Sequence, residues 1–407
     1  MNSENGKNNK NTKRILQLSA KYLMPTYARI PIALDRGDGV RVWDTQGRCY
    51  LDFLAGIAVM SLGHSHEELV ETICNQAGRI IHCSNLYHIE SQARLAQKLS
   101  SISFAQTSFF CNSGAEANEA AIKLARKSGY DRGAFEVIAM ENSFHGRTIA
   151  TVALTGQDKY RTYFGPYPPG FKFARFNDSS DVEKHMGKQT CAVIIEPIQG
   201  EGGIHEASAE FLRDVRELCD RSGALLIFDE VQCGLGRTGR WFAHELCGVE
   251  PDIMTLAKPL AGGLPIGALL AGEKAAHVFA PGDHASTFGG GALITSVALK
   301  VLEIIERDSL IENAATQGEY FKKRLTALMA RIPIIKELRG QGLMLGLELN
   351  CDARPILDAA REKGLLIGLA GARTLRFVPP LIITAEHVDE AVDILESILL
   401  EAVPAGS

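Results

Sequence analysis

The chain has no long hydrophobic run. None of the apolar stretches in its 407 residues reaches the ~18 residues that a membrane-spanning helix needs. Residues 1–11 are rich in Asn, Lys and Ser and contain no apolar segment of the kind that marks a secretory signal peptide. We therefore expect no membrane partner, and we expect residues 1–11 to form a disordered tail.

An excess of one charge and paired cysteines are also missing. The 43 Lys and Arg nearly balance the 48 Asp and Glu, so the net charge of −5 gives no basic surface for nucleic acid. The nine cysteines are scattered singly without a C-x-x-C pair. Such a set is typical of reduced thiols in a cytoplasmic protein. A hydrophobic content of 46% is enough for a large core and predicts two domains.

From about residue 66 onward, helical patterns alternate with short apolar strands. Apolar runs at 137–140, 192–195 and 224–228 are separated by amphipathic segments, of which 115–127 and 211–219 are the clearest. This alternation favours an α/β fold with a mostly parallel sheet and helices on both faces. Sheets of this kind bind ligands beyond the carboxyl ends of their strands.

The two ends of the chain predict a smaller α/β unit. Residues 39–53 have the pattern of a hairpin, residues 296–330 predict long helices, and the chain closes with a helix at 385–401. We therefore divide the chain into four parts. These are a tail (1–11), an N-terminal segment of the small domain (12–65), a large domain (66–295) and a C-terminal small domain (296–407).

Two apolar runs each lead to one charged residue. The run 224–228 ends on Asp229, and the run 253–256 is followed by Lys258 in apolar surroundings. A buried lysine amine has a lowered pKa and can condense with the aldehyde of pyridoxal phosphate (PLP). A carboxylate can pair with the pyridinium nitrogen, which makes the ring an electron sink. A surface lysine and a turn-capping aspartate are the plain alternatives, but the apolar context and the cost of an unpaired buried carboxylate favour the PLP site.

Further motifs stand around this pair in a characteristic order. They are Phe110-Cys-Asn-Ser-Gly-Ala-Glu-Ala-Asn-Glu119, Phe144-His-Gly-Arg147, Glu196-Pro-Ile-Gln-Gly-Glu-Gly-Gly203, Ser286-Thr-Phe-Gly-Gly290 and Leu375-Arg-Phe-Val-Pro-Pro380. With them, the chain resembles the class III (ornithine/acetylornithine type) aminotransferases from about Tyr27 to Pro380. The resemblance implies a PLP cofactor and the type I PLP-transferase fold. That fold has a large domain with a mostly parallel, seven-stranded-type sheet, and its small domain uses both chain ends, which should therefore meet.

The resemblance also implies which residues bind the cofactor. Besides Lys258 and Asp229, it implies that Phe144 and Val231 pack on the two ring faces and that Gln232 bonds the phenolic oxygen. A helix start at Ser113, Gly114 and Ala115 would bind the phosphate through backbone N–H groups. An ordinary capped helix and a core phenylalanine are the plain alternatives. Thr287 would reach the phosphate of the neighbouring subunit, which implies a homodimer with shared active sites.

Two arginines are the candidates for substrate binding, because arginine holds carboxylates in a bidentate fork. The resemblance implies that Arg376 binds the α-carboxylate of glutamate or 2-oxoglutarate and that Arg147 binds the distal one. Glu201 would pair with Arg376 while an ω-amino substrate is bound, and Tyr27 would lie near the substrate carboxylate. Surface salt bridges are the plain alternative for both arginines.

Within the family, two segments are most similar to the members that act on N-acetylornithine in arginine biosynthesis. These are Gly56-Ile-Ala-Val59 and Leu62-Gly-His-Ser-His66, and Ile57 stands where ornithine aminotransferases carry a tyrosine. The expected reaction moves the ω-amino group of N-acetylornithine to 2-oxoglutarate, which gives N-acetylglutamate semialdehyde and glutamate. Use of succinylornithine, succinyl-diaminopimelate, free ornithine or GABA stays open, as does an aminomutase. A catalytically dead binding homologue conflicts with the intact Lys258 and Asp229.

Two departures from the family pattern bear on the substrate more than on the chemistry. Gly291-Ala292 stands where the family usually has Asn-Pro, and Pro259 follows the lysine where Ala or Gly is commoner.

Two other patterns are set aside. Residues 234–239 fit G-x-G-x-x-G, but no helix and no later ribose-binding acid follow, so we expect no dinucleotide site. His64 and His66 have no further ligands at metal-binding spacing, so we expect no metal.

Overall fold

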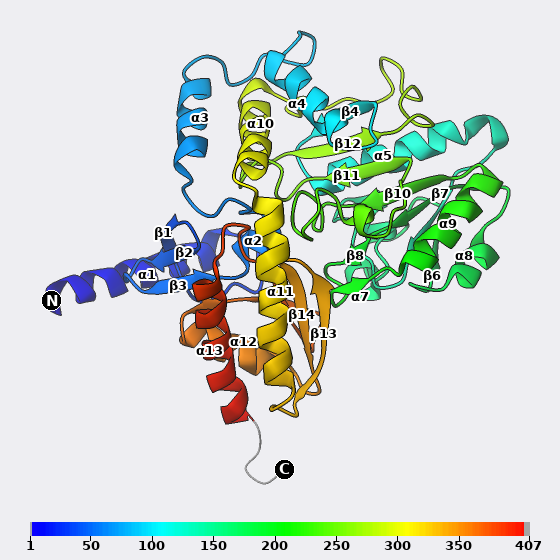
Figure 1. Ribbon diagram of the computed structural model, residues 1–407. Helices are drawn as coiled ribbons and strands as arrows, with labels where there is room; N and C mark the ends of the chain where they lie inside the picture. The colour runs from blue at the N-terminus through cyan, green and yellow to red at the C-terminus, as the bar shows by residue number, and fades with distance from the viewer. Residues whose placement is uncertain (1, 403–407) are drawn as a thin grey trace.

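The computed structural model describes residues 2–402, with side chains from Lys10 onward. A large α/β unit lies beside a smaller unit that combines the N-terminal strands with the C-terminal third of the chain (Figure 1). The second unit is coloured blue at its N-terminal strands and orange to red at its C-terminal part, so segments far apart in the sequence lie together.

A seven-stranded sheet forms the centre of the large unit. In spatial order its strands are β4 (Thr107–Cys111), β12 (Gly267–Ala271), β11 (Ile253–Leu256), β10 (Leu225–Asp229), β7 (Thr190–Ile195), β5 (Glu136–Met140) and β6 (Phe171–Ala174). The five strands from β11 to β6 are parallel, and only β12 runs antiparallel to its two neighbours. The predicted α/β class with a mostly parallel sheet is confirmed.

Helices cover both faces of this sheet because its strands are apolar on both sides. In β5, Val137 belongs to the core under α5 (Gly114–Ser128), whereas Ile138 belongs to the core under α9 (Ala209–Ser222). This alternation follows from the two-residue period of a strand. Ligands in such sheets bind beyond the carboxyl ends of the parallel strands, where the loops can bring polar side chains together.

The smaller unit contains two four-stranded sheets. One has the order β1 (Leu34–Asp38), β2 (Arg41–Asp44), β3 (Cys49–Asp52) and β15 (Leu365–Leu366), and the other has the order β13 (Ile335–Gln341), β14 (Met344–Leu349), β17 (Thr374–Phe377) and β16 (Gly368–Ala370). Strand β15 pairs in parallel with β3, so the expectation that the two ends of the chain meet is confirmed. The predicted hairpin is the antiparallel pair β2–β3.

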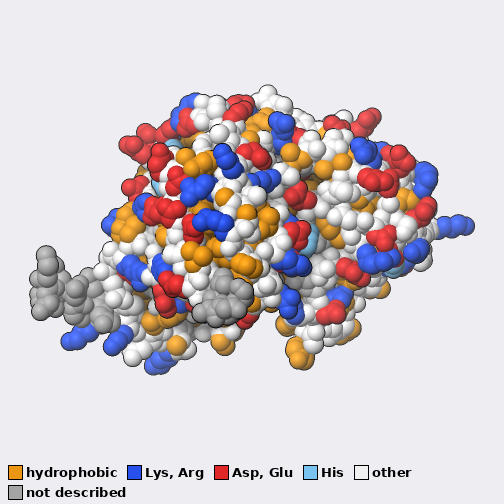
Figure 2. All heavy atoms as spheres, turned by 60° about the horizontal axis from the view of Figure 1, so that its bottom comes forward, with side chains coloured by type: hydrophobic (Ala, Val, Ile, Leu, Met, Phe, Trp, Pro, Cys, Tyr) orange, Lys and Arg blue, Asp and Glu red, His pale blue; other side chains and the backbone are white. Residues whose placement is uncertain are grey.

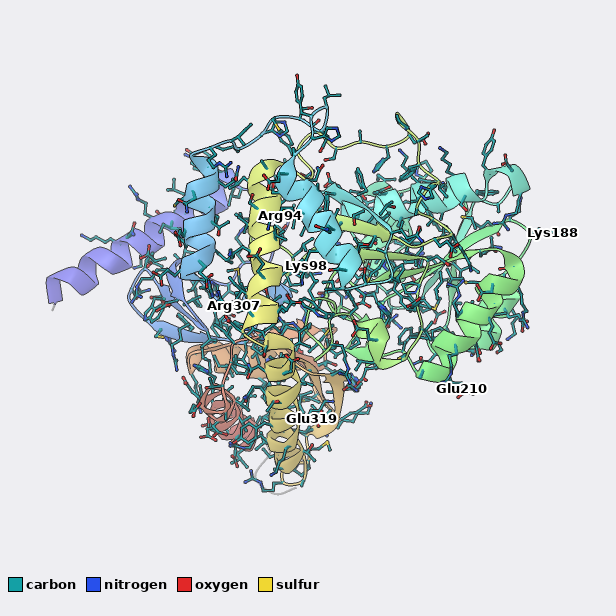
Figure 3. The ribbon with its side chains drawn as sticks, turned by 45° about the horizontal axis from the view of Figure 1, so that its top comes forward. Arg94, Lys98, Lys188, Glu210, Arg307 and Glu319 are labelled. Carbon is teal, nitrogen blue, oxygen red and sulfur yellow. The ribbon has the colours of Figure 1, made fainter. Side chains whose placement is uncertain are left out.

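Two long helices connect the units, and further helices pack beside them. The connecting pair is α10 (Ala292–Arg307) and α11 (Leu310–Met329); α12 (Arg354–Glu362) and α13 (Ala385–Ala402) cover the smaller unit. Helices α3 (Glu67–Ala77) and α4 (Glu90–Ser101) flank α10. Ion pairs reinforce this contact: Lys98 of α4 lies 2.8 Å from Glu306, and Arg307 lies 2.7 Å from Glu68 of α3. Lys98 and Arg307 are labelled in Figure 3.

The N-terminal segment differs from the sequence-based expectation. Helix α1 (Asn2–Tyr22) includes residues 2–11, where the polar composition predicts a disordered tail. The second half of α1 contains Ile15, Leu16 and Leu18, and Thr12 Oγ1 lies 2.7 Å from Thr45 Oγ1. Once such a turn is anchored, each added residue gains one backbone hydrogen bond, so a helix can extend into a polar sequence.

The surface is mixed in charge. On the face shown in Figure 2, basic and acidic side chains are interspersed with small apolar patches. Within residues 2–402, none of the helices combines the length and the apolar content that crossing a membrane requires.

Candidate active site

A cavity of about 410 Å³ lies at the carboxyl edge of the large sheet. Each parallel strand leads into a loop that contributes to its wall, which is why residues distant in sequence meet there. The sequence-predicted residues that line it are Ser113, Gly114, Ala115, Phe144, Arg147, Asp229, Val231, Gln232 and Lys258.

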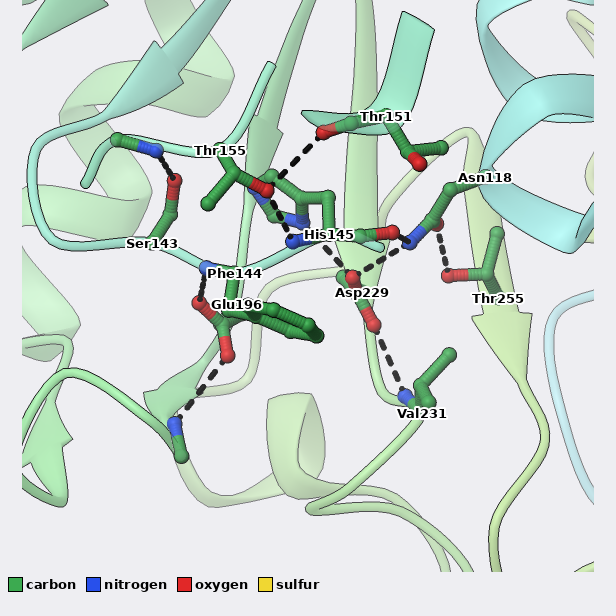
Figure 4. Close-up of polar contacts among 12 residues, drawn as sticks. Asn118, Ser143, Phe144, His145, Thr151, Thr155, Glu196, Asp229, Val231 and Thr255 are labelled. Atoms are coloured by element: carbon green, nitrogen blue, oxygen red, sulfur yellow. Dashed lines mark hydrogen bonds and ion pairs between the residues drawn. The ribbon is translucent and has the colours of Figure 1, made fainter. Parts of the chain in front are cut away.

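Asp229, at the end of β10, is buried in a fixed network (Figure 4). Its Oδ2 accepts hydrogen bonds from Asn118 Nδ2 and lies 2.7 Å from His145 Nδ1, while Oδ1 accepts from Val231 N at 3.1 Å. Asn118 is itself held, because its Oδ1 accepts from Thr255 Oγ1 at 2.8 Å. The carboxylate therefore has one orientation, and among the described residues only the backbone N–H of Val231 binds its Oδ1.

Lys258 follows β11, the strand next to β10 in the sheet. The register pairs Asp229 with Thr255, so the lysine loop begins beside the aspartate. Burial lowers the pKa of Lys258, and Asp229 and Glu201 oppose that effect. Among the described residues, none hydrogen-bonds to the Lys258 amine. A half-buried amine with a lowered pKa and no hydrogen-bond partner in the described part of the chain is the state that a nucleophilic lysine requires.

The amino-terminal end of α5 forms another wall. Ser113 caps the helix, since its Oγ accepts from Glu116 N at 3.2 Å. A Cβ on Gly114 would lie 2.7 Å from Val231 Cγ1, so only glycine allows this approach. No described residue accepts from the N–H groups of Gly114 and Ala115, which can therefore bind an anion together with the helix dipole.

Phe144 and Glu196 both line the cavity and are linked to each other. Glu196 Oε2 accepts from Phe144 N at 2.9 Å, and Oε1 accepts from Gly200 N at 3.2 Å. Burial raises the pKa of Glu196 to about 7. The ring of Phe144 packs edge-on against Tyr160, with centroids 5.5 Å apart, which holds its aromatic face in place.

Arg376 is buried beside the cavity on β17 and pairs with Glu201. Its Nη1 also donates to Gly200 O and to Gln232 Oε1, each at 3.2 Å, whereas its buried Nε has no partner in the described part of the chain. Burial acts to raise the pKa of Glu201, but the Arg376 guanidinium lowers it. The pair is thus charged, and Gln232 lies in hydrogen-bond contact with it.

Arg147 is exposed at the mouth of the cavity. Its guanidinium lies 4.0 Å from the ring centroid of Tyr160 and 5.3 Å from that of Phe144. No carboxylate among the described residues pairs with it, so its hydrogen-bond donors are available to a ligand.

Besides Arg376 and Glu201, which pair beside the cavity, two further predicted residues do not line it. Tyr27 is 73% exposed, and Thr287 is exposed in the loop that follows β12. Thr287 lines a separate hollow together with Asn85 and Ser286. One chain alone does not bring either side chain to Lys258.

Asn118 and His145 are the site residues that the sequence analysis missed. Both bind Asp229, and His145 Nε2 is buried without a partner in the described residues. His145 stands inside the Phe-His-Gly-Arg motif, which was the available signal. Asn118 stands on the buried face of a predicted helix, where a polar side chain is a sign of a partner.

His64 and His66, for which no metal is expected, lie apart in role: one pairs with a carboxylate and the other precedes a helix. His64 Nε2 lies 2.8 Å from Asp52 Oδ2, and His66 precedes α3. Among the described residues there is no group of three His, Cys, Asp or Glu placed to hold a metal ion.

Comparison with known proteins agrees with this geometry. Residues 22–399 match the family described as aminotransferase class-III. The chain belongs to the class-III aminotransferases and is a PLP-dependent transaminase.

Relatives of known name cover nearly the whole chain. An acetylornithine aminotransferase of Caldanaerobacter subterraneus subsp. tengcongensis is 52% identical over 94% of this chain and 98% of its own. One of Methanothermobacter thermautotrophicus is 47% identical over 95% and 99%.

Solved structures of the same family share the fold. The N-acetylornithine aminotransferase of Stenotrophomonas maltophilia has a TM-score of 0.82 at 39% identity, covering 95% of this chain and 99% of its own. The ornithine aminotransferase of Toxoplasma gondii has a TM-score of 0.92 at 33% identity, covering 96% and 94%.

Proposed function

We propose that the protein moves the ω-amino group of N-acetylornithine to 2-oxoglutarate, which yields N-acetylglutamate semialdehyde and glutamate, a step of arginine biosynthesis. The observation that carries the proposal is the full-length similarity, near 50% identity, to relatives named acetylornithine aminotransferase. The residues of the site support the same chemistry.

The cavity fits PLP at three separate points. The free N–H groups at the start of α5 suit the phosphate, the buried carboxylate of Asp229 suits the pyridinium nitrogen, and the unpartnered Lys258 amine suits the aldehyde. Phe144 and Val231 line the walls as the two apolar ring contacts, and Gln232 would reach the phenolic oxygen. When bound, PLP supplies the electron sink for a carbanion at the amine-bearing carbon.

Lys258 is proposed as the proton carrier. Its Nζ would take up and give back the proton at the amine-bearing carbon of the substrate, while the chemistry of the bound cofactor stabilises the electron pair left behind. Burial lowers the pKa of Lys258, which favours the neutral amine that can act as a base. Asn118 and His145 would support this step indirectly, by keeping the Asp229 carboxylate in one orientation.

Arg376 and Glu201 are proposed to serve the two substrates in turn. With the acylated amine bound, Glu201 stays paired with Arg376, as seen here. With glutamate or 2-oxoglutarate bound, the substrate α-carboxylate would replace Glu201 on the guanidinium. Arg147, unpaired at the mouth, would bind the second carboxylate of these substrates, and Tyr27 would contribute near a substrate carboxylate.

A homodimer with shared sites is part of the proposal. Leu86 and Phe288 are exposed large apolar side chains near Thr287, because Leu86 lines the same hollow and Phe288 is the next residue in the chain. Their two segments are joined, because Asn85 Nδ2 donates to Ser286 O at 3.1 Å and to Gly289 O at 2.8 Å. An exposed apolar surface is typical of a protein–protein interface. A second subunit seated there would bring Thr287 to the partner's phosphate site.

The cysteines support a reducing compartment, and we propose the cytoplasm. All nine are free thiols in the structure, and burial raises the pKa of Cys111, Cys191 and Cys219 to about 12. Such thiols are poor nucleophiles and suit a packing role.

Steady-state kinetics with four amino donors against 2-oxoglutarate tests the proposed substrate. The donors are N-acetylornithine, ornithine, succinylornithine and GABA. We expect N-acetylornithine to have the highest kcat/KM. Ornithine is the second candidate, because solved ornithine aminotransferases share the fold with a TM-score of 0.92. A higher kcat/KM for ornithine or for GABA would overturn the substrate assignment and leave the PLP chemistry standing.

A further inference from the structure

The segment between β3 and α3 contains a left-handed turn. The φ angle is +51° at Ala55, +64° at Gly56, +66° at Ile57 and +62° at Ala58, so α2 (Ala55–Ala58) is one turn of left-handed backbone. Residues with a Cβ avoid this region because the Cβ crowds the following carbonyl oxygen. Three of the four residues have a Cβ, so the surrounding structure must hold the turn. Strained residues persist only where the surrounding structure holds them, and they cluster at functional sites.

A carboxylate–imidazole pair holds the entrance to the turn. Asp52, buried at the end of β3, accepts through Oδ1 from Leu54 N at 3.0 Å and from Ala55 N at 2.8 Å. Its Oδ2 lies 2.8 Å from His64 Nε2. His64 is fixed by its own backbone, which pairs with Gly39 on the far side. One side of the carboxylate thus caps the turn, while the other is oriented by the histidine.

The turn lies between the two halves of the site. On one side, Ser61 Oγ donates to the carbonyl of Pro259, the residue after the cavity lysine, at 3.4 Å. On the other side, Val378 N, two residues after the buried arginine of β17, donates to Phe53 O at 2.9 Å. Val59, directly after the turn, lines the cavity. The conformation of the turn therefore sets the position of one cavity wall.

The segment that contributes Val59 to this wall has no polar side chain. Residues 53–60 read Phe-Leu-Ala-Gly-Ile-Ala-Val-Met, and Ile57 is 38% exposed. A free ammonium brought against such a surface loses its water without gaining a partner, which is costly. A neutral acylated amine loses much less on the same surface.

We propose that Asp52 and His64 are positioning residues that hold the left-handed turn as an apolar wall, and that this wall favours an acylated amine over a free one. The inference rests on the proposed function, since it explains how that site selects its amino donor.

The test is the ratio of kcat/KM for N-acetylornithine to that for ornithine, measured on the PLP-loaded enzyme. We expect His64→Ala to lower this ratio about tenfold, a usual size for discrimination by an apolar pocket. The KM for 2-oxoglutarate should change less than about twofold, because the arginines are untouched. His64→Asn, which is too short to reach Asp52, should lower the ratio equally and serves if the alanine variant does not fold.

A second substitution separates positioning from general damage. Ala55→Gly removes the Cβ that opposes the left-handed turn, so adding it to His64→Ala should restore part of the ratio. The matched control is Glu390→Gln, which breaks the Arg41–Glu390 pair on the neighbouring strand β2. Its ratio should equal that of the wild type.

Two results would contradict these proposals, and they can be told apart. A wild-type enzyme that prefers ornithine overturns the proposed function together with this inference. A wild-type preference for N-acetylornithine that survives His64→Ala and His64→Asn overturns the inference alone, as does an equal loss in Glu390→Gln.

Discussion

The residue that organises the catalytic centre is Asp229. Its carboxylate is fixed by Asn118, His145 and the backbone N–H of Val231. We expect Asp229→Asn to keep PLP bound, since the phosphate and ring contacts remain, but to lower kcat by about 100-fold or more, the scale of losing one preorganised electrostatic partner. Single-turnover kinetics measures the loss of rate, and the absorption spectrum of the bound cofactor measures PLP retention.

The control for this variant is Asp220→Asn, an exposed carboxylate near the end of α9. Its kcat should stay within about twofold of the wild type, as is usual for surface changes. Near-normal kcat in Asp229→Asn would remove this residue from the mechanism.

Glu201 permits a different test at the same scale, because it already pairs with Arg376. Glu201→Ala should leave the guanidinium permanently free for an α-carboxylate. Glutamate should then improve as an amino donor relative to N-acetylornithine by about tenfold, the usual scale for one charged contact. Separate half-reaction rates provide the measurement, with Glu337→Ala, an exposed partner of Arg339, as control. An equal fall in both half-reactions would make Glu201 merely structural.

Single residues were predictable where the sequence surrounds a charge with apolar neighbours. Lys258 and Asp229 stand out for that reason, and the cavity brings both together. Asn118 and His145 were missed because their role depends on a contact between a helix, a loop and a strand end. Such a contact has no local pattern in the sequence.

At the scale of elements, α1 offers a simple test. Residues 1–11 are polar and have no periodic apolar face, and the contact of Thr12 with Thr45 lies outside them. Deleting residues 1–11 should therefore lower the melting temperature by less than about 2 °C and leave kcat/KM unchanged. Differential scanning calorimetry on the holoenzyme checks this. A drop of several degrees would show that the deleted segment docks on the rest of the molecule.

Regular elements were predictable from periodicity, whereas the strained turn was not. The buried strands and the long helices α10 and α11 follow from apolar runs and amphipathic repeats. Nothing in Ala-Gly-Ile-Ala predicts four residues at positive φ, because alanine and isoleucine disfavour that region. The turn depends on Asp52 and His64, which tertiary structure brings to it.

For the whole molecule, the main expectation is that cofactor binding and dimerisation are coupled. Thr287→Ala should weaken PLP retention and make it depend on protein concentration. The lost hydroxyl is worth roughly 1–3 kcal/mol if it binds a charged phosphate, and binding across subunits links the two equilibria. Sedimentation with and without PLP is the measurement, and Thr326→Ala, exposed on α11, is the control.

A fully active wild-type monomer would defeat the shared-site account. An unchanged PLP dissociation constant in Thr287→Ala would leave the dimer standing and remove this residue from the site.

The overall architecture was predictable in part. The meeting of the two chain ends, seen as the pairing of β15 with β3, was expected from the family resemblance. Composition and periodicity alone predict only a second α/β unit, because strand pairing over some 300 residues of separation leaves no trace in local sequence. The subunit interface stays a prediction for the same reason.

The most direct test of the account is to locate the cofactor on the chain. The PLP-loaded enzyme should be yellow, and borohydride reduction followed by peptide mass spectrometry should find the added cofactor mass on Lys258. The control is Lys274→Ala, which replaces an exposed lysine shortly after β12. This variant should carry the label at Lys258 to the same extent as the wild type. Label on another lysine, or no label on a protein that has bound PLP, would contradict the assignment of this cavity as the catalytic centre.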